Sequence, residues 1–345
     1  MQTKMAQETR EIPHVVATQL STNARLWQAV AKDIQARDIA FVVTVARGSS
    51  DHAATFAKYL FEVYLGLPVV SAAPSINTLY HSQLKLKKAL VIGISQSGQS
   101  PDICEVLEQA KQQGALTVAV VNQSESRLAK TADHVIPLLA GPELAVAATK
   151  SYVASLLALT QGVALMAQHS TLLAALPQLP QAMEQALSVS WDPVLTALHR
   201  AHDTLTLARG FGFPVAQEAA LKFKETCRLH AEAFSSAEVL HGPFALIQKA
   251  FPVLQLVQND ATLSGNIALA EKMHALGSQV FMAIPSQLAA IPLGVCPLAL
   301  PTSIHGTLDP LVSAVAFYTM VEKLALLRGY NPDKPENLKK VTETR

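Results

Sequence analysis

The stretch "ALVIGISQSGQSPDICEVLEQAKQQG" (residues 89–114) contains a buried-strand pattern, a polar turn and a helical pattern in direct succession. Residues 89–95 are apolar and rich in β-branched side chains, which favours a buried strand. Pro101 suits the first turn of a helix, and Gly114 is a suitable C-cap at its end. Residues 116–122 form another strand pattern, so the order strand–helix–strand predicts a parallel sheet with right-handed crossovers.

The same alternation extends in both directions along the chain. Two further strands, 41–46 and 134–139, complete a first set, with a helical pattern at 51–65. A second set follows at 204–210, 252–257, 278–285 and 296–301. The region between the sets, about residues 150–200, is helical and punctuated by prolines, which is typical of a connector between two α/β halves.

The predicted fold class is therefore α/β, with two tandem subdomains that each form a mostly parallel sheet flanked by helices. We predict an N-terminal helical segment at 1–40, subdomains at 41–175 and 195–330, and a C-terminal tail at 331–345. "VARGSSDHAATFAKYLFE" (45–62) resembles "LARGFGFPVAQEAALKFKE" (207–225), which supports an internal duplication. Composition alone would classify the tail as disordered.

The overall composition excludes several classes of protein. The chain has 345 residues, 50% of them hydrophobic, and a formal net charge of +1 without any block of like charge. Neither a nucleic-acid surface nor a polybasic membrane patch is indicated. The apolar run at 152–167 is interrupted by polar residues and is short for a membrane span, so it predicts a buried helix. The N-terminus is polar, without the apolar core of a secretory signal.

The cysteines and histidines do not indicate a metal or disulfide site. Cys104, Cys227 and Cys296 are far apart and lack C-x-x-C spacing, which favours a reducing compartment. His199 and His202 have no third ligand nearby in the sequence, so we expect them to be structural. A cytoplasmic protein without a bound metal is the prediction.

Polar loops follow the predicted strands, where ligands bind in open parallel sheets. These loops are "ARGSSD" (46–51), "SQSGQSPD" (95–102) and "NQSESR" (122–127). Gly48 and Gly98 allow a ligand to approach the backbone, and a helix N-terminus supplies free N–H groups. Hydroxyl and amide donors come from Ser49, Ser50, Ser95, Gln96, Ser97 and Ser100.

Together the first two loops predict a phosphate cradle without lysine. No lysine follows Gly98 as a Walker loop requires, and the G-x-G-x-x-G dinucleotide fingerprint is absent. The alternative is an ordinary polar turn in which the serines serve as helix N-caps.

The densest cluster of reactive side chains lies at residues 217–247. On a helix, Glu218, Lys222 and Glu225 share one face because of their i, i+4 and i+7 spacing. The alternative is a stripe of surface salt bridges, but the apolar neighbours leave little of this helix as free surface. His241 precedes a Gly-Pro turn, where a histidine can also simply be solvated.

Eight segments, in order, resemble the sugar isomerase (SIS) family. They are "MAQETREIP" (5–13), "ARGSS" (46–50), "SQSGQSPD" (95–102), "AVAATK" (145–150), "QEAALKFKE" (217–225), "HAEAF" (230–234), "HGPFALI" (241–247) and "PENLKK" (335–340). The resemblance covers nearly the whole chain. It is closest to the isomerase half of glutamine–fructose-6-phosphate aminotransferase and to stand-alone glucosamine-6-phosphate deaminases.

The resemblance implies a role for each matching residue. Phosphate would be held by Ser95, Gln96, Ser97 and Ser100, and the sugar lined by Arg47, Gly48, Ser49, Ser50, Val146 and Ala147. Glu225 would move a proton between C1 and C2, and Glu218 and Lys222 would orient the substrate. His241 would help ring opening, near the neighbouring subunit's site in a homodimer. Lys340 would be the amine near the carbonyl carbon, which implies an ordered tail that closes the active site.

Some positions depart from the family pattern. Arg47 stands where the family often has Cys, Ala148 replaces a Ser, and Gln99 replaces a Glu. Gln2 occupies the place of the cysteine nucleophile that begins the aminotransferase's glutaminase domain. We therefore expect a chemistry that does not use glutamine.

The expected activity is isomerising deamination of glucosamine 6-phosphate to fructose 6-phosphate and ammonia, without a cofactor. The alternatives on the same scaffold are a fructosamine-6-phosphate deglycase, a galactosamine-6-phosphate deaminase and an aldose–ketose sugar-phosphate isomerase. An alternative of another class is a non-catalytic sugar-phosphate sensor. A sensor has no need of Glu225, His241 and Lys340 together.

Overall fold

The computed structural model describes residues 2–288 and 291–340, and the chain divides into two compact units. The β1–β5 unit contains His14–Glu143, Lys150–Pro177 and, at the end of the described chain, Lys339 and Lys340. The β6–β10 unit contains the segment up to Pro13, Leu144–Thr149 and Gln178–Leu338. The long helix α1 (Lys4–Ala36) contributes to both units, and Pro13 lies within it.

The β1–β5 unit is built on a parallel sheet with the strand order β2-β1-β3-β4-β5. Its strands are β1 (Phe41–Val45), β2 (Val69–Ser71), β3 (Ala89–Ser95), β4 (Leu116–Val121) and β5 (His134–Pro137). Strand β3 is buried at every residue. A strand covered on both faces has no solvated side, which explains its continuous apolar run.

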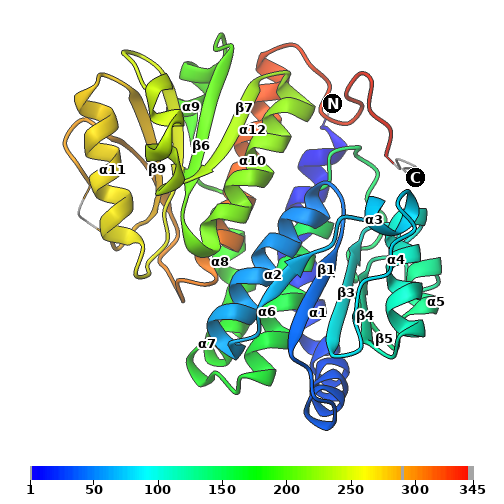
Figure 1. Cartoon of the computed structure of the whole chain (residues 1–345). Helices are drawn as coiled ribbons and strands as arrows, with labels where there is room; N and C mark the ends of the chain where they lie inside the picture. The colour runs from blue at the N-terminus through cyan, green and yellow to red at the C-terminus, as the bar shows by residue number, and fades with distance from the viewer. Residues whose placement is uncertain (1, 289–290, 341–345) are drawn as a thin grey trace. The chain divides into compact units, whose positions relative to one another are not determined.

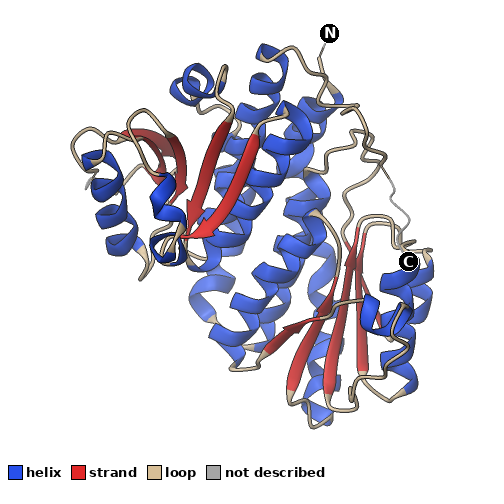
Figure 2. Ribbon diagram, turned by 45° about the horizontal axis from the view of Figure 1, so that its top comes forward, coloured by secondary structure: helices blue, strands red, loops and turns tan. Residues whose placement is uncertain are grey.

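Helices cover both faces of this sheet (Figures 1 and 2). They are the rest of α1, α2 (Ser49–Leu65), the short α3 (Ser75–Thr78), α4 (Pro101–Gln112), α5 (Arg127–Thr131), α6 (Lys150–Met166) and α7 (Ser170–Ala175), with the 3₁₀ turn η1 (Leu176–Gln178) after α7. Side chains of α4 and α5 pack with alternate residues of β1 and β3 in one apolar cluster. Helix α6 is buried at nearly every position, as the apolar run at 152–167 predicted.

The β6–β10 unit repeats this arrangement. Its parallel sheet has the order β10-β9-β8-β6-β7, from strands β6 (Asp203–Ala208), β7 (His230–Ser235), β8 (Pro252–Leu256), β9 (Gln279–Pro285) and β10 (Cys296–Leu300). Its helices are α8 (Leu179–Ala186), α9 (Asp192–Leu198), α10 (Phe213–Cys227), α11 (Leu263–Ala275) and α12 (Asp309–Leu327), with 3₁₀ turns η2 (Gly210–Gly212), η3 (Glu238–His241) and η4 (Pro243–Leu246).

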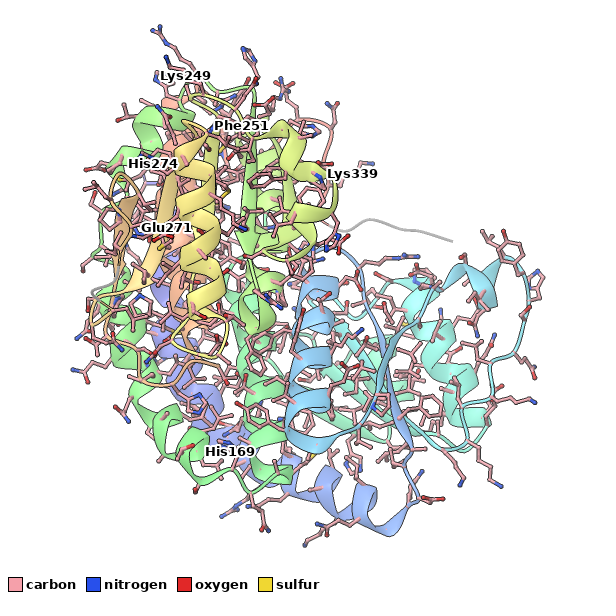
Figure 3. The ribbon with its side chains drawn as sticks, turned by 60° about the vertical axis from the view of Figure 1, so that its left-hand side comes forward. His169, Lys249, Phe251, Glu271, His274 and Lys339 are labelled. Atoms are coloured by element: carbon pink, nitrogen blue, oxygen red, sulfur yellow. The ribbon has the colours of Figure 1, made fainter. Side chains whose placement is uncertain are left out.

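Helix α11 covers one face of this second sheet, and α10 packs against α12 and strand β6. Figure 3 shows α11 with the exposed Glu271 and His274 on it, and Lys249 and Phe251 just before strand β8. The buried side of α11 contributes Leu269, Ala270 and Met273 to an apolar cluster with β8 and β9. The α/β class with two parallel sheets is thus confirmed.

The two sheets have the same strand order when counted from the first strand of each set, which agrees with the predicted duplication. The edge strands β2 and β7 were not predicted. Strand β2 has only three residues. Strand β7 mixes exposed polar residues with apolar ones, because an edge strand pairs on one side only. Helix α4 ends at Gln112 with Gln113 as its C-cap, and Gly114 follows directly in the left-handed conformation (φ +83°). The prediction that a glycine terminates this helix is therefore confirmed, with the glycine one residue beyond the cap.

Helix α12 is, among the described residues, long and apolar enough to cross a membrane by length and composition. Its most apolar window is 72% buried inside the protein. The core helix of a globular unit meets the same criterion, so this helix is weak evidence for a membrane span.

Candidate functional site

The two serine-rich loops lie at the same edge of the β1–β5 sheet, because β1 and β3 are parallel neighbours. Ser95 is the last residue of β3, and its buried hydroxyl accepts a hydrogen bond from Gly98 N at 2.9 Å. Gln96, Ser97 and Ser100 are half-buried behind it, and Gln99 is exposed. The exposure of Gln99 explains how this position can depart from the family pattern without disturbing the loop.

Helix α4 begins at this loop with Pro101 in its first turn. Ser100 is the N-cap residue, but its hydroxyl makes no capping hydrogen bond. In the first turn of α4, Pro101 has no N–H, Ile103 N donates to Asp102 Oδ1 at 2.9 Å, and Cys104 N donates to Ser100 O at 3.1 Å. The helix N-terminus still carries a partial positive charge. The phosphate cradle stays a prediction.

Arg47 joins the two loops through an ion pair. Its Nε and Nη2 both donate to Oδ2 of Asp102, at 3.0 and 2.9 Å, and the Asp102 side chain is fully buried. Gly48, the N-cap of α2, is followed by the half-buried Ser49 and Ser50 in the first turn of that helix. The Arg47 guanidinium thus links the candidate sugar loop, to which Arg47 belongs, to the first turn of α4.

Gly98 is the residue on which the loop's shape depends. It has φ +62°, and a Cβ at this position would lie 2.1 Å from Ser126 Oγ and 2.8 Å from Val121 Cγ2. Its carbonyl accepts from Leu128 N at 3.1 Å. Ser126 itself caps α5 by accepting from Ala129 N, so it cannot easily move.

We expect Gly98→Ala to weaken the binding of a phosphate-bearing ligand at this loop about 10-fold or more, because the loop must shift away from Ser126 and Val121. Isothermal titration calorimetry measures this effect. Gly114→Ala is the matched control: Gly114 has φ +83°, but nothing lies within 4 Å of its added Cβ. Equal affinity losses in both variants would contradict a steric role for the loop.

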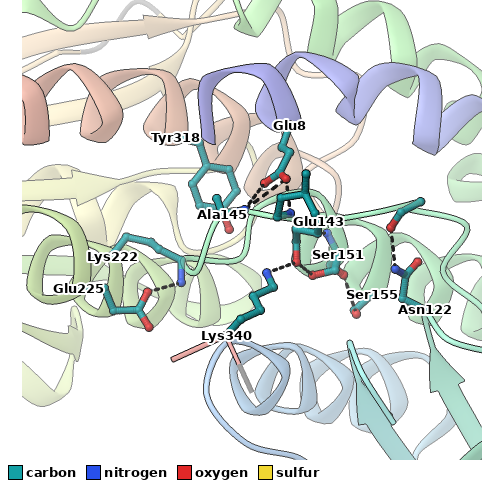
Figure 4. Close-up of polar contacts among 12 residues, drawn as sticks. Glu8, Asn122, Glu143, Ala145, Ser151, Ser155, Lys222, Glu225, Tyr318 and Lys340 are labelled. Atoms are coloured by element: carbon teal, nitrogen blue, oxygen red, sulfur yellow. Dashed lines mark hydrogen bonds and ion pairs between the residues drawn. The ribbon is translucent and has the colours of Figure 1, made fainter. Parts of the chain in front are cut away.

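The predicted catalytic cluster of α10 lies within the β6–β10 unit. Lys222 Nζ contacts Glu218 Oε1 at 3.2 Å. It also contacts Glu225 Oε2 at 2.6 Å, as Figure 4 shows. Lys222 and Glu218 are each 1% exposed, and Glu225 is 21% exposed. The burial excludes the alternative of a surface salt-bridge stripe.

Tyr318 of α12 completes this cluster, because its hydroxyl donates to Glu218 Oε1 at 3.0 Å. The sequence contained no signal for this contact, since Tyr318 stands in a largely apolar helix. Glu218 is thus held by two donors, and Glu225 is the carboxylate of the cluster that reaches solvent.

The charges of the cluster determine the protonation of Lys222. Burial by itself lowers the pKa of Lys222, but the carboxylates of Glu218 and Glu225 outweigh it and raise the pKa above its ordinary value. Lys222 is therefore a permanent ammonium at neutral pH and orients Glu225 rather than acting as a base or nucleophile.

Glu225 also lines a pocket of about 630 Å³ in the β6–β10 unit. The walls are formed by one side of α10 and by residues 329–338. The pocket is lined by Leu221, Lys224, Glu225, Thr226, Arg228, Gly329, Tyr330, Asn331, Lys334, Pro335, Glu336, Asn337 and Leu338. A small polar ligand in this pocket would lie against the Glu225 carboxylate.

The segment 330–338 is ordered by specific contacts within this unit. Arg228 forms an ion pair with Glu336, and its guanidinium lies 5.2 Å from the centre of the Tyr330 ring. Asp333 accepts from the backbone N–H groups of Lys4 and Met5, both at 2.9 Å. The interpretation of this part of the tail as disordered is wrong, because charge pairs and a helix N-terminus hold it. Residues 341–345 of the predicted tail lie outside the described residues.

Val146 and Ala147 belong to the segment Leu144–Thr149 of the same unit. Val146 N donates to Asp333 O at 3.1 Å, and Glu8 accepts from the N–H groups of Leu144 and Ala145 (Figure 4). His241 ends the 3₁₀ turn η3 and is exposed, and it does not line the pocket beside Glu225. Its proposed role in a neighbouring subunit stays a prediction.

Lys340 lies in the β1–β5 unit, where its Nζ contacts Glu143 Oε2 at 3.1 Å. Sequence reasoning did not select Glu143, although it is the nearest acidic residue before "AVAATK". The structure therefore divides the predicted residues. The predicted phosphate-binding residues, Arg47 to Ser50 and Lys340 lie in one unit, and Glu218, Lys222, Glu225, His241, Val146 and Ala147 lie in the other.

The carboxyl end of the second sheet differs from that of the first. After β8, Asp260 Oδ1 accepts from Thr262 N at 2.8 Å and from Thr262 Oγ1 at 2.6 Å. Burial raises the pKa of Asp309 to about 6, against hydrogen bonds from Asn259 N and Ser303 Oγ. Because carboxylates already accept from these donors, this end is a poor site for a phosphate.

Comparisons with known proteins agree with the fold described above. The SIS domain family matches residues 34–165. A protein from Silicibacter pomeroyi, assigned as a phosphosugar isomerase, is 42% identical and has a TM-score of 0.90, over 96% of this chain and 100% of that one. The C-terminal domain of glucosamine-fructose-6-phosphate aminotransferase from Francisella tularensis is 25% identical with a TM-score of 0.86, over 97% and 99% of the two chains.

Curated relatives include the glutamine–fructose-6-phosphate aminotransferase (isomerizing) of Bradyrhizobium diazoefficiens, which is 30% identical over 97% of this chain. The chain spans 58% of the length of that relative. The strand order, the two sheets and these similarities lead to one conclusion: this chain belongs to the sugar isomerase (SIS) family.

Proposed function

We propose that the protein catalyses the isomerising deamination of glucosamine 6-phosphate to fructose 6-phosphate and ammonia. The observation that carries the proposal is the Glu225 carboxylate, which lines a pocket while a buried ammonium holds it at 2.6 Å. A carboxylate fixed in this way suits repeated proton transfer between neighbouring carbons. The similarity to an aminotransferase that is named isomerizing supports an amino-sugar phosphate as the substrate class.

The reaction begins with the open-chain aldehyde form of the amino sugar. Glu225 removes the proton from C2, the C1 carbonyl oxygen takes up a proton, and an enolamine forms between C1 and C2. Protonated Glu225 then returns its proton to C1, and the amino group loses one N–H proton as the C2 imine forms, while the hydroxyl stays on C1. Water adds to this imine, and loss of ammonia leaves the C2 ketone of fructose 6-phosphate.

Each predicted residue has a part in this mechanism. The loop that contains Ser95, Ser97 and Ser100 is assigned to the phosphate because its hydroxyls and the α4 N-terminus are anion donors. Lys222 keeps the Glu225 carboxylate oriented through their 2.6 Å contact. Lys340 is assigned to the carbonyl end of the substrate, where a positive charge stabilises the oxygen that gains electron density.

His241 is assigned to ring opening in a second copy of the chain. The histidine is exposed, and the exposed side chains of Leu240 and Leu246 lie close to it in the sequence. An imidazole between apolar surface residues is suited to an interface with another subunit. A homodimer in which His241 serves the neighbouring site is therefore part of the proposal.

The second candidate is an aldose–ketose sugar-phosphate isomerase. The same Glu225 carboxylate supports it, because proton transfer between C1 and C2 does not require an amine on the substrate. The two candidates differ in one product, since only the deaminase releases ammonia.

A coupled ammonia-release assay tests the proposal. Purified protein is expected to release ammonia from glucosamine 6-phosphate and not from unphosphorylated glucosamine. The same screen includes galactosamine 6-phosphate, a fructosamine 6-phosphate and glucose 6-phosphate, the last with fructose 6-phosphate as the detected product. Isomerisation of glucose 6-phosphate without any ammonia release would favour the second candidate, and binding without either reaction would favour a sensor.

A further inference from the structure

The side chain of Glu143 is a buried carboxylate that sequence reasoning did not assign to the site. The Glu143 side chain is fully buried. Glu143 is the last residue of the segment His14–Glu143 of the β1–β5 unit. Its Oε1 accepts from Ser151 N at 3.0 Å, and its Oε2 accepts from Ser151 Oγ at 2.7 Å. A buried charge that has lost its water needs such donors.

The third donor to this carboxylate is the ammonium of Lys340, at 3.1 Å from Oε2 (Figure 4). Lys340 stands 197 positions from Glu143 in the sequence, and its side chain is 25% exposed. The contact therefore joins a tail residue to the first turn of α6, which contains Ser151. A partly exposed lysine pinned to a fully buried carboxylate has lost most of its conformational freedom.

We propose that Glu143 is the positioning residue for Lys340: its buried carboxylate directs Lys340 Nζ to one place through the 3.1 Å ion pair. The catalytic part of this inference rests on the proposed function.

Two substitutions distinguish the positioning of Lys340 from capping of the α6 N-terminus. Ser151 alone would satisfy the carboxylate at the α6 N-terminus through its N–H and hydroxyl. Glu143→Gln keeps an oxygen that accepts from Ser151 but removes the charge that Lys340 pairs with. Ser151→Ala does the reverse, because it removes the hydroxyl contact and leaves the ion pair.

The kinetic test compares four variants in the ammonia-release assay: Glu143→Gln, Lys340→Met, the double variant and Ser151→Ala. We expect Glu143→Gln to lower kcat about 10-fold or more, with a smaller change in KM. The double variant should be no slower than Lys340→Met, since residues that act through one contact are not additive. Independent, multiplying effects of the two substitutions would overturn the positioning role.

Ser151→Ala is the control for helix capping. It should keep kcat within about 2-fold while lowering the thermal midpoint of unfolding. If Ser151→Ala and Glu143→Gln lower kcat equally, Glu143 acts as a helix cap and the proposal is wrong.

A second measurement does not depend on the reaction. Trypsin should cleave after Lys340 about 10-fold faster in Glu143→Gln than in the unaltered protein, because the side chain must leave Glu143 to enter the protease. Cleavage after the exposed Lys249 gives the internal reference rate. Unchanged protection of Lys340 would contradict the anchoring even if no substrate were ever found, whereas lost protection without ammonia release would reject only the proposed function.

Discussion

Replacing Glu225 with glutamine is expected to reduce ammonia release by about 100- to 10,000-fold while the affinity for glucosamine 6-phosphate stays within a few-fold of the unaltered protein. Glutamine has the size of glutamate, and its carbonyl oxygen can still accept from Lys222, which contacts Glu225 at 2.6 Å. The substitution therefore removes the basic group and leaves the shape of the pocket.

Two measurements separate this result from general damage. The ammonia-release assay gives kcat, and calorimetry with glucosamine 6-phosphate gives the affinity. Glu271→Gln, an exposed glutamate on α11 (Figure 3), is the control and should leave both values unchanged. Retained turnover in Glu225→Gln would exclude Glu225 as the proton carrier, and an equal loss of binding would indicate a structural role instead.

Replacing Lys222 with methionine is expected to have the largest effect on stability. Methionine fills much of the same volume but removes the ammonium that contacts two carboxylates, one of them 1% exposed. Breaking a buried ion pair by removing one partner costs about 3–5 kcal/mol of the free energy of unfolding. Turnover should also fall, because Glu225 loses the group that orients it.

The charge interpretation is tested by a second substitution. Lys222→Met with Glu218→Gln should recover part of the lost stability, since the buried carboxylate is then neutral and still accepts from Tyr318. Denaturant unfolding followed by circular dichroism compares the single and double variants. A double variant that is no more stable than Lys222→Met would show that packing, and not the uncompensated charge, is responsible for the loss.

The same cluster limits how the activity can depend on pH. The pKa of Lys222 is raised, so the stability that its charge provides is fully present below the ordinary lysine pKa of 10.5 and is lost only as the pH rises above it. Any change of rate between about pH 5 and 9 must therefore come from other groups.

Much of the candidate site could be read from local sequence patterns. A glycine with positive φ, a proline in the first turn and a run of hydroxyls identify the loop at 95–102, because each acts within a few residues of its neighbours. The i, i+4 and i+7 spacing of Glu218, Lys222 and Glu225 likewise requires only a helix. Edge strands β2 and β7 were missed because they are short or half-solvated, so their apolar signal is weak.

Contacts between distant residues could not be predicted in this way. Tyr318 lies 100 positions from Glu218, and Lys340 lies 197 positions from Glu143. A tyrosine in an apolar helix and a lysine in a polar tail have no periodicity that identifies a partner. The family resemblance named Lys340 as functional but did not indicate which carboxylate holds it.

The sequence by itself determined the α/β class, the duplicated halves, the position of the serine-rich loop at 95–102 and the helix that bears Glu225, because these follow from local backbone preference and hydrophobic periodicity. Only the tertiary structure decided which charges are buried, which carboxylate meets solvent and which buried glutamate anchors Lys340. Burial and pairing arise when segments far apart in the chain pack together, and they set the free energy of each charge.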